Sequence, residues 1–267
     1  MKVNAIIFVS LSLFLCWTHV DSRINLDFKL KYVSKLDMAE ESVDDMYFGC
    51  NDLMHEKVMG KYSEEMYTGP FKEAWKKAEK CANIKSTEQN LREHEGITKA
   101  HLKAICAYTD DAIYRTFNND CRNGKKSYGS LFQFHTLHFF LTSAVQILNK
   151  HYSCHNTFRR TNRIFNVKEN ETVRFGSFAS TSYNRTLYEK YGIKSCFEVE
   201  TCAGGFLNKL SVVDEEEVLI PPYEMFIIGG IIKDKKKMKD MGVESCEVLY
   251  VLKSAGYKSN LNCKLVR

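Results

Sequence analysis

The sequence has little proline and no strong excess of charge of one sign. Proline occurs three times in 267 residues, and we find no internal repeat and no low-complexity tract, so no long linker is indicated. The formal net charge is +5, with Lys and Arg interspersed among Asp and Glu, which gives no indication of nucleic-acid binding. The one dense basic run, KDKKK at residues 233–237, is interpreted as a solvated turn between strands.

Several motifs that carry common chemistries are absent. The sequence has no GxxxxGK[ST] phosphate loop, no GxSxG nucleophile elbow, no HExxH metal helix and no closely spaced CxxC pair. His135 and His138 lie three residues apart in an apolar, helix-like segment, a spacing that could suit a metal. Because no third ligand is close in sequence, we interpret both as packing residues of a helix and expect no metal.

No apolar run is long enough to span a bilayer comfortably. The apolar residues 5–17 (AIIFVSLSLFLCW) follow Lys2 and precede the small residue Ser22, a pattern typical of a cleaved secretory signal over residues 1–22. Residues 259–267 (SNLNCKLVR) are polar and basic, without the hydrophobic tail of a lipid-anchor signal. We therefore expect a secreted, extracellular protein that has no membrane anchor and is a monomer.

The cysteine count agrees with this compartment. Of ten cysteines, Cys16 would leave with the signal, and the others would form disulfides in an oxidising environment, with at least one free thiol. Cys106 lies in an apolar helical stretch and is interpreted as a buried thiol. The sequons at Asn170 and Asn184 predict glycosylation of a secreted surface.

The hydrophobic period changes near residue 150. Residues 36–150 mix charged and apolar side chains at spacings of three and four, which predicts helices. Later segments are short, rich in β-branched and aromatic residues, and often alternate, as strands do. We expect an α+β fold in one integrated domain (23–267), with a helical part (23–150) followed by a β-rich part (151–267). A central helix is indicated by one apolar stripe, formed by Leu131, Phe134, Leu137, Leu141, Val145 and Leu148.

An acidic run meets an apolar stretch in EEEVLIPPYE, residues 215–224. If Glu217 opens a strand, Glu215 shares its face and Glu216 points the other way. Two adjacent carboxylates in a cleft can divide a chemical task between them. The alternative is an edge loop with solvated charge.

The β-rich part carries three further polar features at its predicted strands. Arg159 lies on the first strand, the hydroxyl cluster Ser180–Ser182 ends the second, and Glu217 begins a later one. An arginine, a serine and a glutamate in this order resemble the ADP-ribosyltransferase fold. VRFGSFASTS and EEEVLIPPYEMF resemble strands of the vertebrate arginine-specific ecto-mono-ADP-ribosyltransferases, and SVDDMYFGC, AYT, LHFFLT and SNLNC resemble that family's helical half and C-terminus. The likeness covers nearly the whole mature chain.

The resemblance implies a sandwich-like NAD-binding core after the helices, with NAD as co-substrate and NADP as an alternative. Cleavage of the bond between nicotinamide and ribose leaves an oxocarbenium-like cation, which Glu217 would stabilise. Ser180 would hold Glu217 in place, and Arg159 would bind the pyrophosphate or the ribose. Glu215 would receive the guanidinium of the acceptor arginine and take its proton as the new C–N bond forms.

The family match also assigns contacts with NAD to Tyr108, Ser177 and Ser211. Tyr191 has two interpretations, over the nicotinamide or in packing. The sequence departs from the family pattern twice. Ser177 stands where glutamine is usual, which predicts a shorter or water-mediated hydrogen bond to the co-substrate. Arg160 stands where glycine is usual, and it could crowd the site or add a phosphate contact.

The resemblance pairs Cys50 with Cys263 and Cys154 with Cys202. The first bridge would close a loop of about two hundred residues, where chain entropy gives a disulfide the most stabilisation, in principle about 4–5 kcal/mol. The remaining cysteines are left without assigned partners, and a third bridge stays open.

The implied function is transfer of ADP-ribose from NAD to arginine side chains of extracellular proteins. An NAD glycohydrolase, in which water replaces the guanidinium, is one alternative, and a secreted binding domain without catalysis is another. The presence of Arg159, Ser180, Glu215 and Glu217 together argues against the binding domain.

Overall fold

The computed structural model describes residues 33–69, 71–150, 154–186, 191–213 and 215–267, so the predicted signal over residues 1–22 lies outside the described residues. The chain divides into two compact units, 36–162 with 167–267, and 1–35 with 163–166. In the second of these, β1 (Val33–Ser34) pairs in parallel with β3 (Ile164–Phe165). No helix in the described part of the chain is both long and apolar enough to cross a membrane.

In the larger unit the main helices precede the strands along the chain, as predicted. These helices are α2 (Asn51–Met59), α3 (Phe71–Lys85), α4 (Glu88–Glu93), α5 (Lys99–Thr109), α6 (Asp111–Asn123) and α7 (His135–Asn149), with short 3₁₀ turns η1 (Ser63–Met66) and η2 (Lys125–Ser127). Side-chain oxygens of Thr87, Thr98 and Asp110 accept backbone N–H groups at the starts of α4, α5 and α6, which satisfies donors that a helix leaves unpaired.

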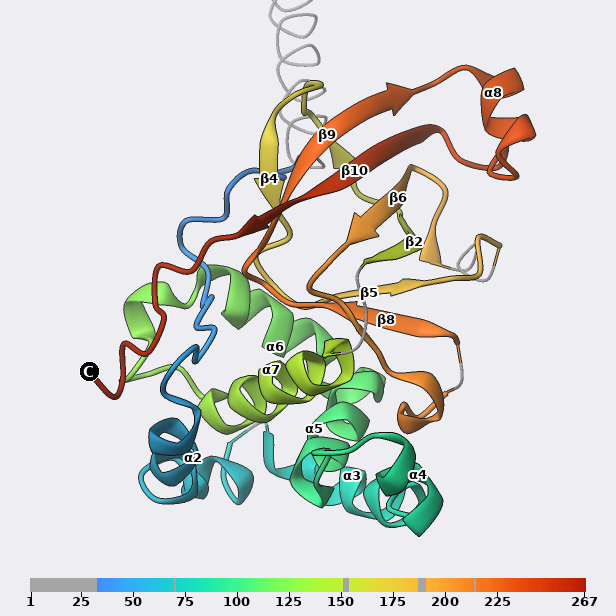
Figure 1. Ribbon diagram of the computed structural model, residues 1–267. Helices are drawn as coiled ribbons and strands as arrows, with labels where there is room; N and C mark the ends of the chain where they lie inside the picture. Colours follow the sequence, from blue (N-terminus) through green and yellow to red (C-terminus); the bar gives the residue numbers. More distant parts are fainter. Residues whose placement is uncertain (1–32, 70, 151–153, 187–190, 214) are drawn as a thin grey trace, which may run out of the picture. The chain divides into compact units, whose positions relative to one another are not determined.

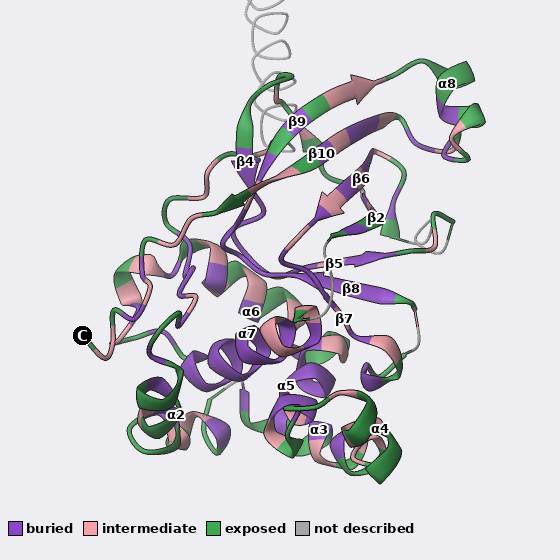
Figure 2. Ribbon diagram, in the orientation of Figure 1, coloured by how far each residue is buried: buried purple, intermediate pink, exposed green. Residues whose placement is uncertain are grey.

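The central helix is shorter than its apolar stripe. α7 starts at His135 and is buried along most of its length (Figure 2), but Leu131 precedes it and is 83% exposed. The inclusion of Leu131 in the stripe is therefore wrong. Residues 42–50, also expected to be helical, form extended and turn structure that runs to the start of α2. Buried side chains in this segment follow from its polar contacts, described below, and not from a helical period.

The strands form one mixed sheet of eight strands in the order β4-β9-β10-β6-β2-β5-β8-β7. Only β6 and β10 pair in parallel in this sheet, and helices α2 to α7 gather along the side of the sheet that carries β5 and β8 (Figure 1). The α+β class is confirmed. The bounds are β2 (His155–Thr161), β4 (Thr172–Arg174), β5 (Ala179–Ser182), β6 (Ser195–Thr201), β7 (Gly205–Phe206), β8 (Glu217–Ile220), β9 (Glu224–Ile232) and β10 (Val248–Tyr257).

Two sequence patterns in this half have clear structural outcomes. In β6, Phe197 and Val199 are buried while Glu198 and Glu200 are half-buried, as strand alternation predicts. The basic run at 233–237 enters a short helix, α8 (Lys235–Asp240), which connects β9 to β10 and is capped by the Asp234 carboxylate. Its lysines are exposed, so the prediction of a solvated connection between strands holds, with a helical turn in it.

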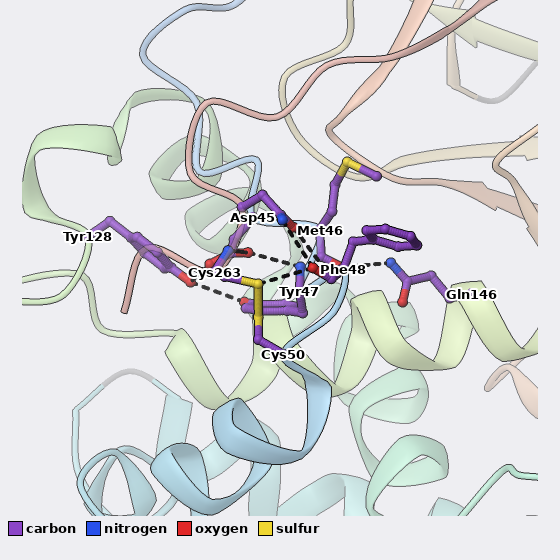
Figure 3. The surroundings of a disulfide bond; sticks show 9 residues. Asp45, Met46, Tyr47, Phe48, Cys50, Tyr128, Gln146 and Cys263 are labelled. Atoms are coloured by element: carbon purple, nitrogen blue, oxygen red, sulfur yellow. Dashed lines mark hydrogen bonds between the residues drawn. A yellow bond between two sulfur atoms is a disulfide. The ribbon is translucent and has the colours of Figure 1, made fainter. Parts of the chain in front are cut away.

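Buried carboxylates tie residues 42–50 to the end of the chain. Asp44 forms an ion pair with Arg174 at 2.6 Å between Oδ2 and Nη1, and both side chains are fully buried. Figure 3 shows Asp45 beside the Cys50–Cys263 disulfide, where it accepts the backbone N–H groups of Tyr47 and Cys263. Such pairing is needed because an unpaired buried charge costs several kcal/mol, typically about 3–5.

The two central histidines belong to the same core. His138 is fully buried, with Nδ1 2.7 Å from the Tyr47 hydroxyl and Nε2 3.0 Å from the Val43 carbonyl oxygen. His135 contacts the Glu65 carboxylate through Nδ1 at 2.6 Å. Both act as packing residues of α7, and the described residues contain no group of three or more side chains that could hold a metal ion.

The described residues contain four disulfides. Cys50–Cys263 and Cys154–Cys202 are those that the resemblance implied. Cys81–Cys106 and Cys196–Cys246 are additional, and the interpretation of Cys106 as a buried thiol is wrong, because the packing of α3 against α5 brings Cys81 to it. Cys121 is a buried free thiol.

Candidate active site

Glu217 and Ser180 lie on neighbouring antiparallel strands. The pairing of β5 with β8 places Ser182 opposite Glu217 and Ser180 opposite Leu219. Residues two apart on a strand share a face, so Ser180 lies diagonally across from Glu217. The Ser180 hydroxyl is hydrogen-bonded to the Glu217 carboxyl.

The environment of Glu217 controls its charge. Glu217 is only 6% exposed, and burial, with the nearby charge of Glu215, raises the pKa of Glu217 to about 7. The hydrogen bond from Ser180 and the positive charge of Arg159 oppose this rise and favour the ionised form. Glu217 is therefore a buried carboxyl group that gains its charge near neutral pH.

Arg159 approaches the same place from β2, where it is paired with Phe197 of β6. Its Nη1 donates to the Ser180 carbonyl oxygen at 2.6 Å, and its Nη2 to the Tyr114 hydroxyl at 3.5 Å. The half-buried guanidinium is thus held between β5 and α6 with a defined orientation.

Glu215 precedes β8 and is half-buried. The Ser182 hydroxyl donates to the Glu215 carbonyl oxygen at 2.7 Å, and the Tyr191 hydroxyl lies 3.4 Å from both Glu215 carboxylate oxygens. Glu216 is exposed, with a φ of +49°, in the left-handed region that few non-glycine residues adopt. Glu216 precedes the strand and its backbone departs from strand geometry, so regular alternation does not extend to it, and its orientation away from Glu217 stays a prediction.

Tyr108, at the end of α5, completes the contacts of Ser180. It is 1% exposed, hydrogen-bonded to Ser180, and its hydroxyl accepts the Asn118 side-chain N–H at 3.2 Å. Burial raises the pKa of Tyr108 well above its usual value, so the phenol stays neutral. Ser180 is therefore bonded to Glu217 and to Tyr108 and accepts from Arg159 through its backbone.

One face of α6 runs along this group. Tyr114, Asn118 and Arg122 are spaced four residues apart, and four residues bring a helix back to nearly the same face. Tyr114 contacts Arg159, Asn118 contacts Tyr108, and Arg122 Nη2 donates to the Ser177 hydroxyl at 3.0 Å. We call these three residues the α6 stripe.

A family model described as NAD:arginine ADP-ribosyltransferase matches residues 36–242, which contain every side chain of this group. The chain belongs to the NAD:arginine ADP-ribosyltransferase family. NAD is the co-substrate that the name of the family gives.

Two curated relatives support the assignment. Ecto-ADP-ribosyltransferase 5 of Bos taurus is 34% identical over 219 residues, which cover 77% of this chain and 69% of the relative. The erythroblast NAD(P)(+)--arginine ADP-ribosyltransferase of Gallus gallus is 34% identical over 245 residues, which cover 87% of this chain and 76% of the relative.

A solved structure agrees with the fold. The crystal structure of the eukaryotic mono-ADP-ribosyltransferase ART2.2 matches with a TM-score of 0.72 at 30% identity, over 86% of this chain and 98% of that one. A mutant of ART2.2 solved in complex with NAD matches with a TM-score of 0.69 at 29% identity, with the same coverage.

Ser177 and Ser211 are both buried. Ser177 follows Gly176, whose φ is +68° and whose position leaves no room for a Cβ, since one would lie 2.3 Å from the Ala39 Cβ. This turn at the end of β4 directs Ser177 to Arg122. Ser211 ends the 3₁₀ turn η4 (Asn208–Leu210), and its hydroxyl donates to the Val213 carbonyl oxygen at 2.5 Å. Contacts of both serines with NAD stay predictions.

Arg160 neither crowds the group nor joins it. It is 4% exposed, its Nε and Nη2 donate to the Arg185 carbonyl oxygen, and its Nη1 donates to the Ser245 hydroxyl at 2.6 Å. Neighbouring residues on a strand point to opposite faces, so Arg159 and Arg160 serve different surroundings. These contacts hold Arg160 beside Arg185 and Ser245, and a phosphate contact of Arg160 stays a prediction.

The α6 stripe was not identified from the sequence. The sequence does contain a pattern that indicates the stripe. Ile113, Phe117 and Cys121 recur every four residues and form the buried face of α6, and the residue directly after each of them belongs to the stripe. The stripe also begins six residues after Tyr108, the nearest residue of the motif on the helical side. An amphipathic helix that begins shortly after Tyr108 therefore indicates that residues at the edge of its buried face lie close to the site.

Proposed function

We propose that this chain transfers ADP-ribose from NAD to the guanidinium of arginine in extracellular proteins. The proposal rests on the surroundings of Glu217. This carboxyl group is buried, is hydrogen-bonded to Ser180 and lies near the guanidinium of Arg159. A second carboxylate, that of Glu215, lies nearby and is half-buried. Arg159, Ser180, Glu215 and Glu217 are the proposed catalytic set, and Tyr108, Ser177 and Ser211 the proposed NAD contacts.

In the proposed reaction, the bond between the ribose C1′ and the nicotinamide nitrogen breaks, and nicotinamide leaves with the electron pair. The ionised Glu217 stabilises the positive charge that develops on the ribose, and Ser180 holds Glu217 in position. Arg159 holds the co-substrate with a guanidinium fixed by Ser180 and Tyr114.

The acceptor completes the reaction at Glu215. A guanidinium nitrogen attacks C1′, forms the new C–N bond and loses a proton, which Glu215 receives. Glu215 is half-buried, so it can reach both the buried carboxyl group and a side chain that enters from solvent. Its pairing with Tyr191 fixes the carboxylate without removing it from the surface.

An NAD glycohydrolase remains the second candidate. Water can attack C1′ in place of the guanidinium, and this route needs Glu217 but no residue that binds arginine. The partial exposure of Glu215 favours the transferase over the glycohydrolase, because hydrolysis by water requires no carboxylate that a protein acceptor can reach.

Incubation with NAD labelled in its adenosine part and the arginine analogue agmatine distinguishes the candidates. Transfer gives labelled ADP-ribosyl agmatine and one nicotinamide per product, whereas hydrolysis gives labelled free ADP-ribose. If the protein binds NAD but releases no nicotinamide, it is not a catalyst, and the alternative of a secreted binding domain would hold.

The pH profile tests the role of Glu217. Because burial raises its pKa to about 7 and only the ionised form stabilises the cation, kcat/KM for NAD should rise as pH increases through about 7 and then level off. Below that pH the rate should fall about tenfold per unit. A midpoint near 4.5, with the protein folded throughout by circular dichroism, would mean that Glu217 does not control the rate.

We also propose that the protein is released from the cell as a monomer and carries glycans at Asn170 and Asn184. The four disulfides support an oxidising compartment, and the relatives named as ecto-enzymes agree with an extracellular place of action. Expression in animal cells should give the activity in the medium, with a mass that falls on removal of N-linked glycans. Activity that stays on cells until a lipid-anchor phospholipase is added would refute release.

A further inference from the structure

Arg122 lies on α6 beside the proposed active site, but the proposed catalytic set of Arg159, Ser180, Glu215 and Glu217 does not include it. It is the last residue of the α6 stripe, two helical turns beyond Tyr114, and it is half-buried. Its Nη2 donates to the Ser177 hydroxyl at 3.0 Å, and Ser177 is 3% exposed. The cationic side chain of Arg122 is thus bonded to the buried hydroxyl of Ser177. It lies on the same face of α6 as Tyr114, which contacts Arg159, and Asn118, which contacts Tyr108.

The position of Ser177 gives this contact its meaning. Ser177 is a proposed NAD contact, and its short side chain ends in one hydroxyl, which the Arg122 Nη2 reaches directly. The guanidinium of Arg122 carries a charge and a fork of N–H donors suited to phosphate oxygens.

Arg159 and Arg122 contact α6 at different places: Arg159 bonds to Tyr114, and Arg122 lies two turns further along the helix. Arg159 is tied to Ser180 and lies near Glu217, so it belongs to the end of the site where the ribose bond breaks. Tyr114 and Arg122 are eight residues apart, which is about 12 Å along a helix. In the proposed function the reacting ribose lies at Glu217, and a dinucleotide that extends from there along the stripe brings its diphosphate toward Arg122.

We propose that Arg122, positioned by Ser177, binds the diphosphate of the NAD co-substrate. The proposal rests on the proposed function for the direction in which NAD lies, but it concerns a residue that the motif does not include. It adds a second cationic contact on α6 to that of Arg159 on β2.

The test measures binding directly, with ADP and adenosine as ligands that differ only in the phosphates. Arg122→Gln should weaken ADP binding roughly ten- to a hundred-fold, the range of a hydrogen bond to a charged group, and leave adenosine binding unchanged. Arg122→Lys should recover part of the loss, because it keeps the charge without the fork. Arg115→Gln is the matched control, since Arg115 lies on the same helix but is exposed outside the stripe.

The same variants should raise KM for NAD with little change in kcat, because a diphosphate contact is equal in the bound and transition states. Equal weakening of ADP and adenosine would overturn the proposal in favour of a structural role, and unchanged ADP binding would overturn it outright. Phosphate-dependent binding at Arg122 in a protein that does not release nicotinamide would uphold this inference and refute the proposed function.

Discussion

The Glu217→Gln variant is expected to lose nicotinamide release and arginine modification together, by roughly a hundred- to a thousand-fold or more in kcat. Glutamine keeps the shape of the side chain and can still bond to Ser180, but it has no charge to stabilise the cation on the ribose. Both transfer and hydrolysis pass through this cation, so neither route can avoid the loss. Steady-state release of nicotinamide, with and without agmatine, measures it.

Stability separates this effect from misfolding. Burial raises the pKa of Glu217 to about 7 from an ordinary value near 4.5, so its protonated form stabilises the folded state fully below pH 4.5, and this stability is lost as pH rises from 4.5 through 7. A neutral glutamine avoids that loss, and the free energy of unfolding at pH 8 should not fall. A stable Glu217→Gln protein that releases nicotinamide at the wild-type rate would remove Glu217 from the mechanism.

Local pattern was sufficient to predict the elements that carry the proposed catalytic residues. The apolar run after Glu217 indicated a buried strand, and β8 begins at that residue. Alternation of buried and half-buried side chains in β6 was equally readable. These features depend on side-chain period alone, which a single sequence displays.

Some features that depend on contacts between distant segments could not be predicted from local pattern. The positive φ of Glu216 accompanies contacts from the strand beside it, where Ser182 and Tyr183 donate to the carbonyl oxygens of Glu215 and Glu216. The Cys81–Cys106 bridge likewise follows from the packing of α3 on α5. Neither contact leaves a mark in the local period of the chain.

The Glu215→Gln variant is expected to separate transfer from hydrolysis. Glu217 still stabilises the cation and water still reaches it, so NAD hydrolysis should persist. Arginine modification should fall about ten- to a hundred-fold, because a charge-assisted hydrogen bond worth roughly 1.5–3 kcal/mol is lost with the guanidinium. Labelled ADP-ribose and ADP-ribosyl agmatine, measured in one reaction, give both rates.

Glu216→Gln is the matched control, because it removes the same charge one residue away. Glu216 is exposed, whereas Glu217 is buried, so both activities should stay near wild type. Equal loss of both activities in Glu215→Gln, or a larger loss in Glu216→Gln, would mean that the two carboxylates do not divide the reaction in this way.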